Sequence, residues 1–316
     1  MRILITGASG LLGLNLALEL ARKHVVFGQV NSQPLQTDLF QVVKTNLLAP
    51  DAVQRLLEQT NPEWVIHCAA MANIDACEAE PIQAREINTE IPRKLAELVA
   101  RGGARLLHVS TDAVFDGIRG NYAEEDTPNP LSIYAQTKLE GERAVSAVNP
   151  DAIVARVNMY GWSLTGKRSL AEFFFYNLQA GMRVMGFTDV FFCPLLVNDL
   201  ADIFIRMFIA GLKGLYHVVS GECVSKHRFG IRIAQRFGLD EKLISPTSVY
   251  ESGLLAARSP NLTLRTDKIS HVLKIEDTNI LPNISTGLEH FYTLYQHGYP
   301  QLVRRLGVEA INGIGN

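Results

Sequence analysis

The chain has 316 residues, of which 47% are hydrophobic and 20% charged, so its composition excludes intrinsic disorder and a fibrous repeat. Thirty Lys and Arg residues against 32 Asp and Glu give a net charge of −2, which argues against nucleic acid or an anionic membrane as a partner. Four cysteines without a C-x-x-C pair predict neither a zinc site nor a disulfide framework, and they favour a reducing, cytoplasmic location.

Strands and helices are predicted to alternate from the first residue to about residue 157. The elements in chain order are a strand at Arg2–Thr6, a helix at Leu11–Arg22, a strand at His24–Val30, a helix at Ala52–Gln59, a strand at Trp64–Ala70, a helix at Pro81–Arg101, a strand at Arg105–Ser110, a loop at Asp116–Leu131, a helix at Tyr134–Val148 and a strand at Ala152–Val157. Such alternation predicts an α/β fold: a Rossmann-type, doubly wound parallel sheet with helices on both faces.

The second half of the chain is expected to form a smaller substrate-binding domain. We predict one more helix at Val197–Ile209 and a strand at Leu215–Ser220 that returns to the sheet. The expected dinucleotide-binding domain therefore covers 1–160 with 196–221, and the substrate domain covers 161–195 and 222–316. The aromatic run Phe173–Phe175 predicts core packing or a homodimer contact, and Met182 and Met185 are interpreted as packing residues.

A glycine motif lies between the first predicted strand and helix. Gly7, Gly10 and Gly13 have the spacing G-x-x-G-x-x-G. The first glycine would allow a tight turn, the second would let the backbone approach a pyrophosphate, and the third would let the helix pack on the strand. The motif predicts a dinucleotide site at the helix N-terminus, which includes the intervening Ser9, Leu11 and Leu12.

The end of the second predicted strand bears on the choice between NAD and NADP. A carboxylate there would bind the ribose of NAD, and an arginine would bind the extra phosphate of NADP. This chain has Asn31 and Ser32 instead, which leave no repulsion against a 2′-phosphate and can hydrogen-bond to it. NADP is slightly favoured, NAD remains possible, and a simple solvated turn is nearly as compatible with these residues.

Tyr134 and Lys138 are four residues apart on a predicted helix, so the phenol and the ammonium share one face. A neighbouring cation would favour the phenolate and lower the tyrosine pKa from about 10 toward neutrality. Ser110, Thr111 and Asp112 follow directly on a predicted strand, where ligands bind in parallel sheets. Hydroxyl, phenol and lysine together predict a proton-delivery system for reducing a ketone with nicotinamide.

The stretches TGASGLLG, HCAA, STDAVFDG and YAQTKLEGE, in this order, resemble the extended short-chain dehydrogenase/reductase family. The segment Ile74–Glu78, with Pro81 and Asn88, is similar to the dTDP-4-dehydrorhamnose reductase branch. The non-catalytic regulatory subunit of methionine adenosyltransferase has a similar pattern. The resemblance is specific over residues 1–160 and looser to about residue 295.

The resemblance implies a role for several residues. Tyr134 would protonate the alkoxide, Lys138 would bind the nicotinamide ribose, and Thr111 would orient the sugar carbonyl. Asn88 would shape the cofactor side, although it could equally be a helix hydrogen-bonder. The small residues Ala69 and Ala70 would support the cofactor backbone, and the predicted cofactor set also includes Asn46 and Ser110.

The substrate side departs from the pattern of the branch. Asp112 is followed by Ala113 rather than a second acid, which disfavours a dehydratase. Phe192 stands where the branch has a glycine, and we expect it to narrow the pocket. With Thr111, Asp112 and Arg258 it completes the predicted substrate contacts, and Lys167 and Arg168 are further candidates to bind a diphosphate. His67 and His108 are interpreted as satisfied core imidazoles, and no metal site is predicted.

The expected activity is the reduction of a 4-keto sugar nucleotide by NAD(P)H in the cytoplasm. A nucleotide-sugar epimerase would use the same groups reversibly. A non-catalytic subunit that holds the dinucleotide and regulates a partner enzyme is the alternative from a different class.

Overall fold

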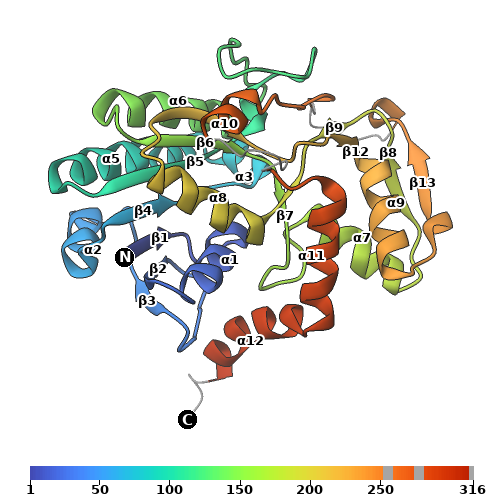
Figure 1. The fold of residues 1–316 in the computed structure, drawn as a ribbon, viewed down its shortest axis with the longest axis horizontal. Helices are drawn as coiled ribbons and strands as arrows, with labels where there is room; N and C mark the ends of the chain where they lie inside the picture. The colour runs from blue at the N-terminus through green and yellow to red at the C-terminus, as the bar shows by residue number, and fades with distance from the viewer. Residues whose placement is uncertain (252–258, 274–280, 313–316) are drawn as a thin grey trace.

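Seven parallel strands form the central sheet of the computed structural model, which describes residues 1–251, 259–273 and 281–312 (Figure 1). They are β1 (Arg2–Thr6), β2 (Val25–Val30), β3 (Gln41–Lys44), β4 (Trp64–His67), β5 (Arg105–Thr111), β6 (Ile153–Val157) and β11 (Gly214–Val218). Their order is β11-β6-β5-β4-β1-β2-β3, so the winding reverses between β1 and β4. The predicted doubly wound α/β class is confirmed, and β3 is an additional strand of only four residues.

Helices cover both faces of this sheet. Ile3 and Ile5 share a core with α1 (Leu11–Leu20) and α8 (Val197–Ile209). Leu4, which points to the opposite face, packs with α2 (Ala52–Thr60), α5 (Ile91–Gly102) and α6 (Ile133–Val148). Both faces of the central strands are therefore buried, which explains why these strands are continuous apolar runs in the sequence.

The helix predicted over Pro81–Arg101 consists of three segments. After α3 (Ile74–Ala79), the chain forms α4 (Pro81–Arg85), a π-helical turn (Glu86–Glu90) and then α5. Pro92 explains the interruption, because it has no N–H for the carbonyl of Asn88 four residues earlier and its ring would clash with that carbonyl. The released carbonyl faces Gly141 of α6, where any Cβ would collide with it.

The described part of the second half of the chain adds short strands and further helices. The strands are β7 (Met159–Tyr160), β8 (Val184–Phe187), β9 (Phe191–Phe192), β10 (Leu195–Leu196), β12 (Val224–Ser225) and β13 (Ile244–Thr247); the helices are α7 (Leu170–Gln179), α9 (Lys226–Phe237), α10 (Asp267–Val272), α11 (Ile284–Gln296) and α12 (Tyr299–Asn312). The strand predicted at Leu215–Ser220 is β11, which pairs in parallel with β6. Trp162 stacks on Phe291 at 4.1 Å between ring centroids and joins α11 to the core.

The interpretation of Met182 and Met185 as packing residues is wrong, because their relative exposures are 55% and 53%. Met182 follows a turn at Gly181, which has φ of 69°, and Met185 occupies an outward position of the alternating strand β8. Phe174 and Phe175 are in the core as predicted, whereas Phe173 is 43% exposed.

A disulfide joins Cys193 to Cys223, which contradicts the prediction from cysteine spacing. The two residues are 30 apart in the sequence, and the antiparallel pairing of Phe192 with Val224 brings them together. No local spacing rule detects such a contact, because the strand pairing creates it. Among the described helices, none combines the length and apolar character that crossing a bilayer would need.

Candidate active site

The glycine turn lies at the reversal point of the sheet, between the ends of β1 and β4. Gly7 has φ of 70°, and a Cβ on it would lie 2.8 Å from the Cα of Ala69. A Cβ on Gly13 would collide with the carbonyl oxygen of Gly7. The amide of Gly10 donates to that same carbonyl at 2.9 Å. The expected turn and helix–strand packing are therefore present, and they require glycine for steric reasons.

Gln29 fixes this turn, although it was not among the predicted site residues. Its side chain is 2% exposed within β2. Its Oε1 accepts a hydrogen bond from the amide of Gly7 at 3.0 Å, and its Nε2 donates to the carbonyl of Thr45 at 2.7 Å. A glutamine in an otherwise apolar strand was the available signal, because a buried polar side chain needs partners.

Two cavities meet at the glycine turn, with volumes of 230 and 620 Å³. Both are lined by Gly7, Gly10, Cys68, Ala70 and Arg168. The smaller cavity is further lined by Ser9, Gln29, Asn31, Asn46, Leu47, Leu48, Ala69, Ile87 and Ile91. The larger is further lined by Leu11, Leu12, Gly13, Ala72, Asn73, Val109, Ser110, Tyr134, Lys138 and Met159.

The lining of the two cavities has a clear charge preference. It includes the cations Lys138 and Arg168 and no carboxylate from the described residues. The whole chain has a net charge of −2, so this cleft differs from the rest of the molecule. Cationic side chains beside a helix N-terminus favour a polyanionic ligand. The cleft therefore suits the phosphates of a dinucleotide.

Tyr134 and Lys138 reach the larger cavity from the first turns of α6. Ser132 caps this helix by accepting a hydrogen bond from the amide of Ala135 at 3.2 Å. The hydroxyl of Thr111, at the end of β5, interacts with the phenol of Tyr134. The tertiary structure thus brings together the three residues that we predicted to act on a ketone.

The electrostatics differ from the expectation that Lys138 would lower the pKa of Tyr134. Burial raises the pKa of Tyr134 to about 12. Burial also lowers the pKa of Lys138 to about 8, and its Nζ donates to the carbonyl of Val109 at 2.7 Å. Desolvation is the main cause at the phenol, and the nearby Asp112 and Cys77 raise its pKa further. The phenol is therefore protonated at neutral pH, as a proton donor must be.

Thr111 and Asp112 are buried and are not among the residues that line the two cavities. Their exposures are 9% and 4%. Thr111 Oγ1 donates to Asp112 Oδ1 at 3.1 Å, and the amide of Asn158 donates to Oδ2. Burial raises the pKa of Asp112 to about 6. In this arrangement the aspartate orients Thr111, and contact with substrate remains a prediction for both residues.

Three other predicted contacts lie elsewhere among the described residues. Phe192 is 6% exposed and packs edge-on against Phe229 at 5.4 Å between ring centroids, so it belongs to the core rather than a cavity wall. Ser32 is exposed and Lys167 is exposed, and neither lines the two cavities. Arg258 lies outside the described residues.

Asn88 fixes the position of a loop on the cofactor side of the site. It is 1% exposed and lies in the π-helical turn. Its amide nitrogen donates to the carbonyl of Met71 at 3.0 Å and to Thr137 Oγ1 at 3.1 Å, and its oxygen accepts from the amide of Met71 at 2.9 Å. Asn88 therefore ties the loop after β4 to α6 and makes its contribution through that loop.

Buried polar side chains are hydrogen-bonded to residues in or next to the site. Arg156 forms an ion pair with Glu142 at 2.7 Å, and Ser110 Oγ donates to the same carboxylate at 2.6 Å. His67 and His108 stack at 5.4 Å. His67 Nδ1 bonds Thr6 Oγ1 at 2.7 Å, but in the described chain the other three ring nitrogens of this pair have no hydrogen-bond partner. These imidazoles are buried as predicted but only partly satisfied.

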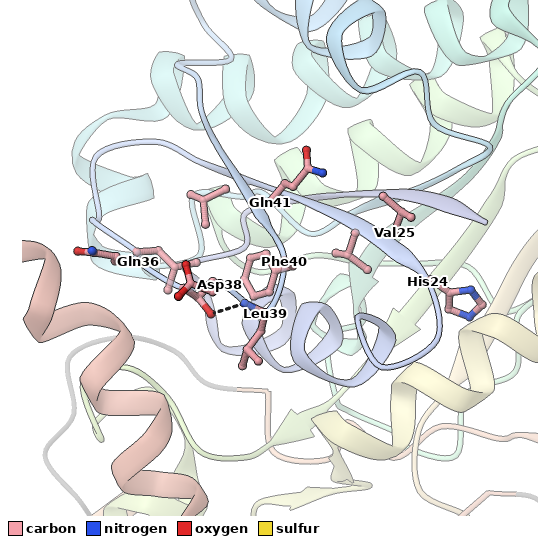
Figure 2. A pocket seen from close by; sticks show the side chains of 11 residues that line it. His24, Val25, Gln36, Asp38, Leu39, Phe40 and Gln41 are labelled. Carbon is pink, nitrogen blue, oxygen red and sulfur yellow. Dashed lines mark hydrogen bonds between the residues drawn. The ribbon is translucent and has the colours of Figure 1, made fainter.

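A further cavity, of 740 Å³, lies away from these residues (Figure 2). It is lined by His24 and Val25 at the start of β2, by the loop around Phe40 and by Gln41 at the start of β3. It therefore opens near the amino ends of these strands. Ligands of parallel sheets bind at the carboxyl ends, where the glycine turn lies.

Sheet order, glycine turn and the Tyr134–Lys138 pair define a Rossmann-type member of the extended short-chain dehydrogenase/reductase class. The model of the RmlD substrate-binding domain family matches residues 1–293, and the chain belongs to that family.

Proteins with different functions are similar to this chain. The probable low-salt glycan biosynthesis reductase Agl14 of Haloferax volcanii is 34% identical over 266 residues, which cover 82% of this chain and 87% of that protein. Methionine adenosyltransferase 2 subunit beta of Bos taurus is 33% identical over 270 residues, covering 82% and 78%. The solved dTDP-4-dehydrorhamnose reductase of Bacillus anthracis in complex with NADP gives a TM-score of 0.78 at 25% identity, covering 92% and 98%.

Proposed function

We propose that this protein is an NAD(P)H-dependent reductase of a 4-keto sugar nucleotide. The observation that carries the proposal is that Tyr134 and Lys138 line the same cavity as the glycine turn. A catalytic phenol beside a dinucleotide cradle is what ketone reduction needs. The similarity to solved dTDP-4-dehydrorhamnose reductases supports this substrate class.

The proposed chemistry adds a hydride and a proton to the C4 carbonyl and yields an alcohol. A bound nicotinamide would supply the hydride. Tyr134, protonated at neutral pH, donates its proton to the carbonyl oxygen as negative charge develops there. Lys138 stabilises the phenolate that remains, and Thr111 holds the phenol in position from the end of β5.

We infer NADP as the preferred cofactor. Asn31 lines the smaller cavity, and the lining contains no carboxylate from the described residues to repel a 2′-phosphate. The first amides of α1, at Leu11–Gly13, have no partner within the helix and can donate to phosphates. The Bacillus anthracis reductase, which is similar to this chain, is solved with NADP.

A regulatory subunit that binds the dinucleotide without turnover is the second candidate. The 33% identity to methionine adenosyltransferase 2 subunit beta favours it. A nucleotide-sugar epimerase would use the same Tyr134 and Lys138. Both alternatives keep the cofactor site and differ in what happens to the keto sugar.

The test measures the oxidation of NADPH in the presence of a panel of 4-keto sugar nucleotides. The loss of absorbance by the reduced nicotinamide, at about 340 nm, gives the rate. The reductase predicts turnover in the wild type and a loss of about 10²- to 10⁴-fold in kcat for Tyr134→Phe, with unchanged cofactor affinity. Tyr122→Phe is the matched control, because that phenol is bonded to Asp116 away from the cavities. Tight NADPH binding without turnover of any substrate supports the regulatory subunit.

Assembly and location are further parts of the proposal. A homodimer is proposed from the exposed Phe173 on α7, which is 43% accessible beside two buried phenylalanines.

A cytoplasmic location is proposed because the chain has few cysteines. The bond between Cys193 and Cys223 is the one observation against a strongly reducing compartment among the described residues.

A further inference from the structure

Arg168 lies where the two cavities of the cleft meet. The loop between β7 and α7 carries it, whereas the other residues common to both cavities follow β1 and β4. Asn31 lines only the smaller cavity and Tyr134 only the larger. A dinucleotide that runs from one cavity to the other must place its diphosphate between them. Arg168 is the charged side chain at that junction.

The guanidinium of Arg168 is free to receive an anion. The side chain is exposed, and within the described parts of the chain it forms no ion pair or hydrogen bond. Several other arginines, such as Arg156 and Arg232, are paired with glutamates. Unpaired arginines are common on protein surfaces, so the position of its loop determines whether Arg168 can bind a ligand.

The loop that carries Arg168 is fixed by a buried carboxylate. Glu172 is 1% exposed and accepts from Ser163 N at 2.6 Å, Ser163 Oγ at 2.8 Å and the backbone amide of Arg168 at 3.0 Å. Ser169 completes a capping box with Glu172 and donates to the carbonyl of Gly161 at 2.8 Å. The backbone of Arg168 is thus held in place before any ligand binds, which reduces the entropy cost of using its side chain.

We propose that Arg168 is a ligand of the cofactor diphosphate, supplied from outside the glycine motif. The inference rests on the cofactor site of the proposed function and goes beyond it, because the glycine turn alone would bind through backbone amides. A guanidinium can bind phosphate oxygens in a bidentate manner, in a geometry that amides at a helix N-terminus do not provide. The residue also links cofactor binding to the half of the chain expected to hold the substrate.

The experiment measures the dissociation constants of NADP⁺ and NAD⁺ for the wild type, Arg168→Gln and Lys167→Gln, without sugar substrate. Both cofactors contain the diphosphate, so Arg168→Gln is expected to weaken both by the same factor of about 10 to 100. Lys167→Gln is the matched control: it removes a neighbouring exposed charge that lines neither cavity, and affinities should stay within about twofold of the wild type. Arg168→Lys should recover part of the loss.

Other results separate the failure of this inference from failure of the proposed function. Equal affinities for wild type and Arg168→Gln overturn the role of Arg168 and leave the cofactor site intact. A loss confined to NADP⁺ overturns it in favour of a 2′-phosphate ligand. Unchanged cofactor affinity with a raised KM for a sugar nucleotide overturns it in favour of a substrate ligand. A wild type that binds neither dinucleotide overturns the proposed function itself, and with it the inference.

Discussion

The ammonium of Lys138 donates a 2.7 Å hydrogen bond to the carbonyl of Val109, the residue two positions before Thr111 in β5. This bond ties the catalytic helix α6 to the strand that carries Thr111. It also holds the lysine inside the protein, where burial lowers its pKa to about 8. The position that makes Lys138 useful therefore also sets the pH range in which it is charged.

We expect kcat/KM to fall as the pH rises through about 8, because the free protein then loses the ammonium of Lys138. The sign follows from the lowered pKa: the charged form is present below about pH 8 and is lost above it, well before the usual value of 10.5. Steady-state rates from pH 6 to 10 measure the effect. Lys138→Arg should move the alkaline limb to higher pH, and an unchanged limb in that variant would assign it to another group.

Gly7→Ala is expected to destabilise the fold more than Gly103→Ala. Both glycines have positive φ, 70° and 75°, so alanine has about the same backbone cost of 1–2 kcal/mol at either position. Only at Gly7 does the added Cβ meet backbone, 2.8 Å from Ala69, while nothing lies within 4 Å at Gly103. Steric overlap should add about 1–3 kcal/mol at Gly7. Urea unfolding of both variants gives the difference, and equal losses would show that the β1–β4 approach is not tight.

Removing one partner of the buried pair Glu142–Arg156 should cost about 3–5 kcal/mol, because the other charge is then buried alone. Arg156→Met provides the measurement by chemical denaturation. Asp151→Asn breaks an exposed ion pair, in which the side chain of Asp151 is 70% accessible and that of Lys213 is 57% accessible. This variant should change the free energy of unfolding by about 0–1 kcal/mol. The double variant Glu142→Leu with Arg156→Met is expected to recover much of the loss. A small effect of Arg156→Met alone would contradict the role of the pair.

Reduction of the bond between Cys193 and Cys223 should lower the free energy of unfolding by about 2–4 kcal/mol. The bond closes a loop of 30 residues, so it restricts the unfolded chain. Thermal unfolding with and without a dithiol measures the effect. The double variant Cys193→Ser with Cys223→Ser should unfold at the same temperature in both conditions, since Cys68 and Cys77 are free thiols. If the melting temperature of the wild type were the same with and without the dithiol, the bond would not be present in solution.

Local patterns in the sequence were sufficient to predict the class of fold and the parts of the cleft that are continuous in the chain. Gly7–Gly13 and the pair Tyr134–Lys138 each lie within one turn or helix, so spacing alone reports their geometry. Pro92 also carried a usable signal, because a proline inside a helix frees the carbonyl four residues earlier. That signal was sufficient to predict the break that the continuous helix over Pro81–Arg101 omitted.

Contacts between distant segments were decided only by the tertiary structure. The bond between Gln29 and Gly7, the disulfide and the placement of Arg168 beside the glycine turn all join residues more than 20 positions apart. Burial, too, is a property of the folded chain, and it raised the pKa of Tyr134 where a neighbouring lysine alone would have lowered it. Sequence spacing determined which chemical groups are present, and packing determined which of them meet and in which protonation state.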